Sequence, residues 1–209
     1  MTPEQIHLII QDEIGAEYPN DKRYYNAKCA SPIWAGGGSG VTIGIGFDLG
    51  FNTKAEITKA WGSKVNGNHL VYFLECSGIK GIVAKKKIGA ISRSIKIPYE
   101  IAIEVFMESS LPKFTKLTKS IYPNLDNLND TTQAILIGLV YNRGASLKDK
   151  EGSTRRVEMR ELVDATNKAD YAVIAALIHR MKRLWVGTDV SGLVERRENE
   201  SKLILNSIA

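Results

Sequence analysis

The spacing of apolar residues predicts a largely helical chain. Apolar side chains recur at helical intervals from Ile6 to Ile14, and Pro3 suits the first turn of a helix. We therefore expect a helix over residues 3–17, with Gly15 weakening its end. Further amphipathic stretches follow the first quarter of the chain. They predict helices over 53–61, 68–76, 98–120 with a break at Pro112, 131–143, about 155–166, 169–182 and 192–207.

One stretch breaks this pattern. Seven glycines fall within the fifteen positions from Gly36 to Gly50, and Val41, Ile43 and Ile45 alternate with small or polar residues. That alternation predicts a short strand after a glycine-rich turn. The fold class is then α+β, a single domain over residues 1–209. We expect a small glycine-rich β lobe over about 18–52, and a larger helical lobe over 53–209 that packs with the helix over 3–17.

Composition and charge narrow the classes of protein. The chain has 209 residues, 44% hydrophobic, with a net charge of +5, which favours anionic partners without choosing among them. Two cysteines, Cys29 and Cys76, do not make a disulfide framework. No apolar run is long enough for a membrane span or follows a basic N-terminal region. We expect a monomer made in the cytoplasm without a signal peptide.

Motif screens exclude several chemistries. The chain has no Gly-x-x-x-x-Gly-Lys-[Ser/Thr] motif, and Leu49 stands where a dinucleotide fingerprint needs its third glycine. Its three histidines are far apart and form no His-Glu-x-x-His, so we expect no metal and no organic cofactor. A cysteine–histidine nucleophile pair, from Cys29 or Cys76 with His69 or His179, stays open.

Three oxygen-bearing residues form the candidate catalytic set. Glu17 is expected at the end of the first helix, Thr42 on the glycine-rich strand and Asp48 just after it. Glycosidic cleavage needs an acid for the leaving oxygen and a second oxygen group on the other face of the sugar. Each residue also has a simpler interpretation. A glutamate at a helix end is usually solvated, threonine favours strands and aspartate favours turns.

Several ordered motifs resemble the lysozyme-like superfamily, in particular pesticin-like and related phage muramidases. The segment Ser39–Gly50, SGVTIGIGFDLG, is similar to their sheet lobe. The remaining matches are Pro32-x-Trp34-x-Gly36-Gly37, Leu139–Gly144, Arg155-Arg-x-Glu-Met159, Met181–Trp185 and Gly192–Glu198. Together they run in order from about residue 17 to 205.

The resemblance implies a lysozyme-like fold and a phage-type muramidase, or endolysin. Such an enzyme hydrolyses the β-1,4 bond between N-acetylmuramic acid and N-acetylglucosamine in bacterial peptidoglycan. The family's Thr matches Thr42, and its Asp, six residues later, matches Asp48. Its Glu closes the first helix. That residue is assigned to Glu17, 25 residues before Thr42, with Glu13, 29 residues before it, as the alternative and Asp21 as a minor acidic candidate.

The expected roles follow from this resemblance. Glu17 protonates the glycosidic oxygen, while Asp48 and Thr42 position water or stabilise the oxocarbenium-like transition state. Tyr141, Asn142 and Arg143 are expected to bind substrate, although helix packing and capping explain them equally well. Trp34 and Trp185 suit sugar stacking or the core. The basic residues expected mostly on solvated helix faces are Arg155, Arg156, Lys182, Arg183, Arg196 and Arg197.

Three alternatives remain open. A lytic transglycosylase uses one glutamate and no water, which leaves Thr42 and Asp48 unexplained. A non-catalytic wall-binding module needs no acid. Nucleic-acid binding fits the positive charge, but no recognised DNA-binding motif occurs, and we expect no nucleic-acid partner. An enzyme of this class acts on the bacterial cell wall after release or delivery.

Overall fold

The computed structural model describes residues 2–15, 20–188 and 192–209. The chain divides into two compact units, which are described separately. The sheet unit comprises residues 13–113, and the helical unit comprises residues 1–12 and 114–209. The predominance of helix and one small antiparallel sheet confirm the α+β class at this level.

The sheet unit holds three short antiparallel strands in the order β1-β2-β3. They are β1 (Ile33–Trp34), β2 (Val41–Ile43) and β3 (Phe47–Asp48). Strand β2 confirms the predicted strand at Val41 and Ile43, but Ile45 belongs to the turn that follows. Gly44 and Gly46 take φ angles of 58° and 66° in this turn, which ends the strand and reverses the chain.

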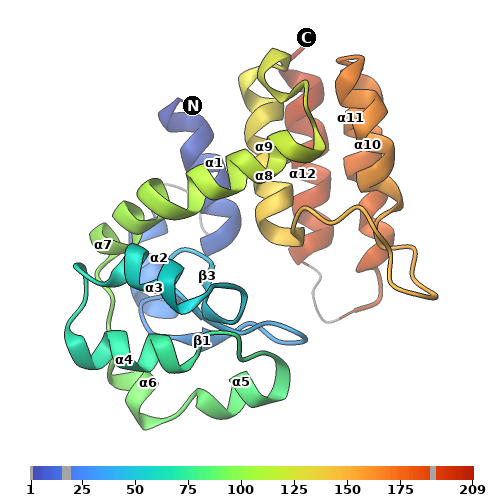
Figure 1. The fold of residues 1–209 in the computed structure, drawn as a ribbon. Coiled ribbons are helices and arrows are strands. Elements are labelled where there is room, and N and C mark those ends of the chain that lie inside the picture. Colours follow the sequence, from blue (N-terminus) through green and yellow to red (C-terminus); the bar gives the residue numbers. More distant parts are fainter. Residues whose placement is uncertain (1, 16–19, 189–191) are drawn as a thin grey trace. The chain divides into compact units, whose positions relative to one another are not determined.

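Helices make up the rest of the sheet unit (Figure 1). Thr53 caps α3 through a reciprocal hydrogen-bond pair with Glu56, as the sequence of this helix start favours. The helices α2, α5 and α6 had no counterpart in the sequence-based prediction. The elements are α2 (Asp21–Lys28), the 3₁₀ turn Leu49–Phe51, α3 (Lys54–Trp61), α4 (Gly67–Glu75), α5 (Gly81–Lys87), α6 (Ala90–Ser94) and α7 (Tyr99–Val105).

The core of the sheet unit centres on Trp61, which is fully buried. Phe47 and Phe73 contact it edge-on, with ring centroids 5.7 Å and 5.8 Å away. A Cβ atom at Gly44 would lie 2.9 Å from the Trp61 ring. Glycine at this position therefore serves both the left-handed turn and the close approach of the indole.

The predicted helix break at Pro112 appears as a change of helix type. A π-helical segment, Phe106–Ser110, joins α7 to α8 (Leu111–Ile121). Pro112 has no N–H to give to the carbonyl of Glu108, so the α-helical hydrogen-bond ladder cannot run through this point. Because Pro112 falls in the first turn of α8, the missing donor costs that helix nothing.

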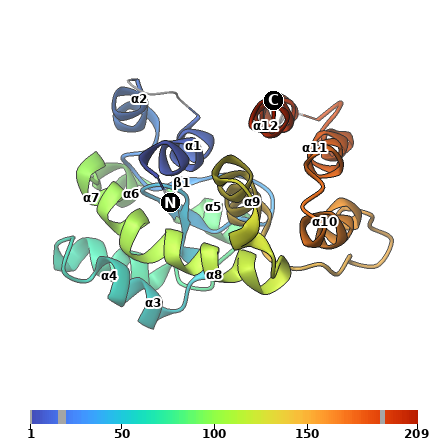
Figure 2. The ribbon, with the colours of Figure 1, turned by 90° about the horizontal axis from the view of Figure 1, so that it is seen from above.

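The helical unit contains a row of packed helices. Helix α11 packs against α10 and α12, and α12 also contacts α9. Figure 2 shows α10, α11 and α12 following one another in this row. The elements are α1 (Pro3–Ile14, which continues into the sheet unit), most of α8, the 3₁₀ turn Leu125–Asn127, α9 (Asp130–Arg143), α10 (Val157–Asn167), α11 (Tyr171–Arg180), the 3₁₀ turn Met181–Leu184 and α12 (Gly192–Asn206).

The end of α1 and the start of α9 differ from the prediction for identifiable reasons. Helix α1 ends at Ile14 rather than at residue 17, because Gly15 adopts a φ of 80°. Helix α9 begins at Asp130, one residue before the predicted start at 131, because its N-cap is Asn129, whose side chain accepts a hydrogen bond from the Thr132 amide. The predicted end of α9 at residue 143 is confirmed, and Gly144, which follows it, again has a positive φ.

Two arginines of α12 contradict the expected solvated helix face. Arg197 is fully buried and Arg196 is nearly so. Arg196 pairs with Asp12 of α1 at 3.2 Å and with Glu200 at 3.0 Å, and Arg197 pairs with Glu200 at 2.9 Å. Buried charges need such partners, and here they come from α1 and from the next turn of α12.

Candidate functional site

The β2–β3 hairpin brings two of the predicted catalytic residues together. Thr42 and Asp48 are direct cross-strand partners, and both are partly exposed on the same face of the sheet. Ile33 of β1 is the partner of Thr42 on its other side and completes this row. On the adjoining strand positions Val41 and Ile43 are buried, so the period-two alternation of β2 separates an accessible row from the core.

Backbone amides hold the Asp48 carboxylate in place. The Gly40 amide lies 3.1 Å from Oδ1 and 2.9 Å from Oδ2, and the Gly50 amide donates to Oδ1 at 2.8 Å. Neither position has room for a side chain. A Cβ at Gly40 would lie 2.2 Å from Oδ1 and 2.5 Å from the Gly50 nitrogen, and a Cβ at Gly50 would lie 2.4 Å from the Ile79 carbonyl oxygen. The glycine-rich pattern thus builds a cradle for this one carboxylate.

Burial raises the pKa of Asp48 above its ordinary value. The amide N–H groups of Gly40 and Gly50 and the Lys80 ammonium act in the opposite direction, since each favours the ionised form. Lys80 itself lies 3.8 Å from the centre of the Phe51 ring. Asp48 is therefore a fixed, partly desolvated carboxylate at the edge of an accessible sheet face. Sequence reasoning found Asp48 but neither its amide cradle nor Lys80.

Three acidic residues near the end of α1 are candidates for the catalytic site: Glu17, Glu13 and Asp21. Glu17 lies outside the described residues. Glu13 is the penultimate residue of α1 and is partly buried. Asp21, the minor candidate, is 5% exposed in the first turn of α2 and accepts a hydrogen bond from the Tyr99 hydroxyl. Asp21 is thus engaged in joining α2 to α7.

The predicted substrate-binding residues belong to the last turn of α9, in the helical unit. The Tyr141 ring packs against Phe114, with centroids 4.4 Å apart. Asn142 is exposed, while Arg143 donates to the main-chain oxygen of Arg155 and lies 5.2 Å from the Trp185 ring. Asn142 and Arg143 line a pocket together with Trp185.

The two tryptophans proposed for sugar stacking are both engaged within the protein. Trp34 donates from Nε1 to the Ser39 carbonyl at 3.1 Å. Trp185 is 6% exposed, with the guanidinium groups of Arg143 and Arg155 at 5.2 Å and 6.0 Å from its ring. For Trp185 the packing interpretation therefore fits better than sugar stacking.

Other chemistries find little support in the described ranges. Cys29 and Cys76 are free thiols, and burial raises the pKa of each above its usual value, which disfavours the nucleophilic thiolate. Within residues 2–15, 20–188 and 192–209, no group of three or more His, Cys, Asp or Glu side chains is arranged to hold a metal ion. None of the helices there combines the length and apolar character needed to cross a bilayer.

Comparison with known proteins adds no relative. No protein-family model matches the chain, and no curated protein matches it significantly in sequence. The resemblance to lysozyme-like muramidases therefore rests on the ordered sequence motifs alone.

Proposed function

We propose that the chain is a peptidoglycan muramidase that hydrolyses the β-1,4 bond between N-acetylmuramic acid and N-acetylglucosamine. The pairing of Thr42 with Asp48 across β2 and β3 carries the proposal. A hydroxyl and a carboxylate with a shared orientation on an accessible sheet face suit one wall of a sugar-binding site. The sequence motifs that resemble lysozyme-like enzymes supply the remaining support, including the lysozyme-like fold itself.

In this proposal Asp48 is a fixed negative charge opposite the leaving group. A carboxylate held by two backbone amides keeps its position as positive charge develops on the sugar ring, so little reorganisation is needed in the transition state. Thr42, directly beside it, orients the attacking water. Glu17 is the proposed general acid, with Glu13 as the alternative.

The position at which α1 ends bears on the choice between Glu17 and Glu13 as the general acid. The resemblance places the catalytic glutamate where the first helix closes, and α1 closes at Ile14, directly after Glu13. Glu17 keeps the better spacing to Thr42. Glu17→Gln and Glu13→Gln variants, assayed for lysis side by side, separate the two: the general acid is the residue whose amide variant loses about 100-fold or more in activity.

Mass spectrometry of digested peptidoglycan tests the reaction itself. Purified sacculi treated with the protein should release muropeptides with a reducing N-acetylmuramic acid end. Anhydro ends would identify a lytic transglycosylase, and free stem peptides an amidase. An unchanged sacculus, with an active lysozyme control, would leave a wall-binding module and overturn the proposal.

A further inference from the structure

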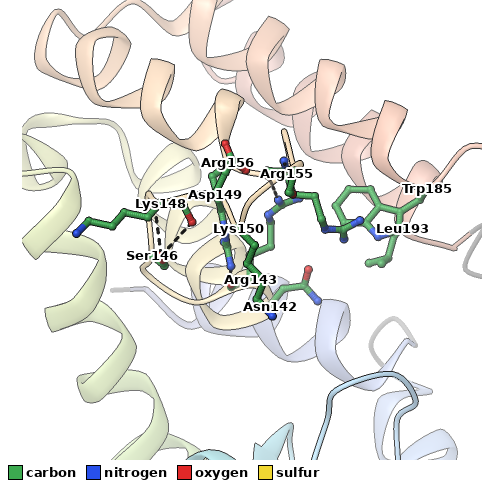
Figure 3. A pocket seen from close by; sticks show the side chains of 11 residues that line it. Asn142, Arg143, Ser146, Lys148, Asp149, Lys150, Arg155, Arg156, Trp185 and Leu193 are labelled. Atoms are coloured by element: carbon green, nitrogen blue, oxygen red, sulfur yellow. Dashed lines mark hydrogen bonds between the residues drawn. The ribbon is translucent and has the colours of Figure 1, made fainter. Parts of the chain in front are cut away.

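A second candidate site lies wholly within the helical unit. It is a pocket of about 570 Å³ between the end of α9, the following loop over residues 144–156, and the start of α12 (Figure 3). The lining side chains that matter here are Arg143, Lys148, Asp149, Lys150, Arg155 and Arg156.

The pocket lining carries a large excess of positive charge. Five of its side chains are cationic and one, Asp149, is anionic. Asp149 is already engaged, because Oδ2 pairs with Arg160 at 2.8 Å and Oδ1 accepts from the Arg156 amide at 2.8 Å. The single carboxylate of the lining is thus committed to holding the loop, and it leaves most of the positive field uncompensated.

Among the lining residues, Arg143 shows the excess of positive charge most clearly. Its Nε and Nη1 atoms are buried and have no hydrogen-bond partner in the described part of the chain. Burial, together with repulsion from Arg156 and Arg155, lowers the pKa of Arg143 to about 10. At neutral pH the guanidinium still carries its charge. A partly buried cation among other cations is costly unless an anion approaches it.

Hydrogen bonds to main-chain oxygens hold Arg143 and Arg156 in place beside the pocket. Arg156 donates from Nη2 to the Arg143 carbonyl at 2.6 Å, and the Arg155 carbonyl accepts from Arg143. Figure 3 shows Arg143 joined to the Arg155 main chain beside Trp185. The Arg155 side chain, by contrast, is exposed, as are Lys148 and Lys150. These exposed side chains are the direct donors available to a ligand.

We infer that this pocket binds the phosphate group of a phosphate ester. A phosphate presents several strongly accepting oxygens, so one group can receive hydrogen bonds from guanidinium and ammonium donors on several sides. A lone carboxylate satisfies one arginine fork. The pocket is also larger than a bare phosphate ion, which leaves room for the organic part of an ester. This inference does not depend on the proposed muramidase activity.

Titration calorimetry on the full chain tests this site, with inorganic phosphate and glycerol 3-phosphate as probes and acetate as the carboxylate control, all at one ionic strength. We expect saturable phosphate binding that weakens about ten-fold or more in an Arg155→Gln/Lys150→Gln double variant. Both substitutions fall on exposed side chains whose loss leaves the Arg143–Arg156 contacts intact. The matched control is Arg93→Gln/Lys96→Gln, which removes two exposed cations from the sheet unit.

Each outcome of the titrations either supports or overturns the inferred phosphate-ester site. Tighter binding of glycerol 3-phosphate than of inorganic phosphate supports the inference of an ester ligand, whereas equal binding would overturn the ester assignment and leave a site for free phosphate. Absence of saturable phosphate binding overturns the inference. So does an equal loss of affinity in the pocket variant and the control variant, because that would reflect net charge alone. Lytic activity is not a readout here, so failure of this site leaves the muramidase proposal standing.

Discussion

Thr42 and Asp48 lie directly opposite one another on the antiparallel strands β2 and β3. They are six positions apart in the sequence, and the tight turn over Gly44–Gly46 folds that interval back on itself. The Asp48 carboxylate then bends towards the Gly40 and Gly50 amides. One hairpin thus sets both the spacing and the orientation of the two residues proposed to act on the sugar.

Asp48→Asn tests the role of the carboxylate in catalysis. We expect lytic activity to fall about 100-fold or more, because a neutral amide cannot stabilise developing positive charge. Stability should also fall, by about 1–3 kcal/mol, since the side-chain NH₂ group would oppose one of the cradle amides. Asp126→Asn is the matched control, an exposed carboxylate paired with Lys119. Equal activity of the two variants would contradict the proposed role.

The acid limb of the pH–activity profile gives a second readout of Asp48. Because burial raises its pKa, protonation should remove the charge at a pH above the ordinary value of 3.8. Wild-type activity is expected to decline as the pH falls through this raised pKa, and so at a higher pH than an exposed aspartate would give. Thr42→Val keeps the carboxylate, so its lower activity should retain the same acid limb. An acid limb that stays unchanged in the residual activity of Asp48→Asn would assign it to another group.

Gly40→Ala tests the cradle by steric means. The new Cβ would meet Asp48 Oδ1 at 2.2 Å and the Gly50 backbone at 2.5 Å, so the carboxylate or the hairpin has to move. We expect a loss of about 1–3 kcal/mol in urea unfolding. At Gly38, two residues earlier, a Cβ meets nothing within 4 Å, which makes Gly38→Ala the control. Equal stability of the two variants would show that the cradle tolerates displacement.

The buried Glu158 is expected to be a major contributor to the stability of the helical unit. It is 1% exposed and receives Arg183 Nε at 2.6 Å and Nη2 at 3.0 Å. Glu158→Gln should cost about 2–4 kcal/mol. Glu161→Gln, which removes an exposed partner of Arg180, should cost no more than about 1 kcal/mol. Similar unfolding midpoints for both variants would contradict the prediction that Glu158 contributes more to stability than Glu161.

The same glutamate has a predictable pH dependence. Burial is the largest single influence on the pKa of Glu158 and acts to raise it. The hydrogen bonds from Arg183, the Glu158 backbone amide and the positive charges of Arg183 and Arg180 together outweigh burial, and the folded-state pKa lies below 4.5. Its contribution to stability is therefore complete above about pH 4.5 and is lost as the pH falls through the depressed folded value. The stability gap between wild type and Glu158→Gln should narrow in that acidic range, as measured by chemical unfolding.

The two thiols should differ in reactivity. Cys76 is fully buried and Cys29 is partly exposed, and burial raises the pKa of both. A chromogenic disulfide reagent should therefore modify Cys29 slowly in the native protein and Cys76 after unfolding. Cys29→Ser and Cys76→Ala should retain lytic activity. Loss of lysis in a variant that still folds would favour a cysteine nucleophile.

The sequence predicts the elements whose signals are local. The helix predicted over 53–61 is found as α3, the helix predicted over 131–143 as α9, and the strand predicted from the alternation around Thr42 as β2. Each signal acts over a few residues, through capping, a positive φ or strand periodicity. Short helices such as α5 and α6 have weaker patterns, so their existence was not expected from the sequence.

Features that depend on distant residues were decided by the tertiary structure. Arg196 and Arg197 have the pattern of a solvated helix face, yet they are buried, because Asp12 lies 184 positions before Arg196 and meets it in the folded unit. The basic pocket likewise gathers the end of α9, a loop and α12. The sequence alone determined the α+β class and the Thr42–Asp48 spacing. Packing decided which charges are buried and where positive side chains converge, since a charge can leave water only where a partner from elsewhere in the chain compensates it.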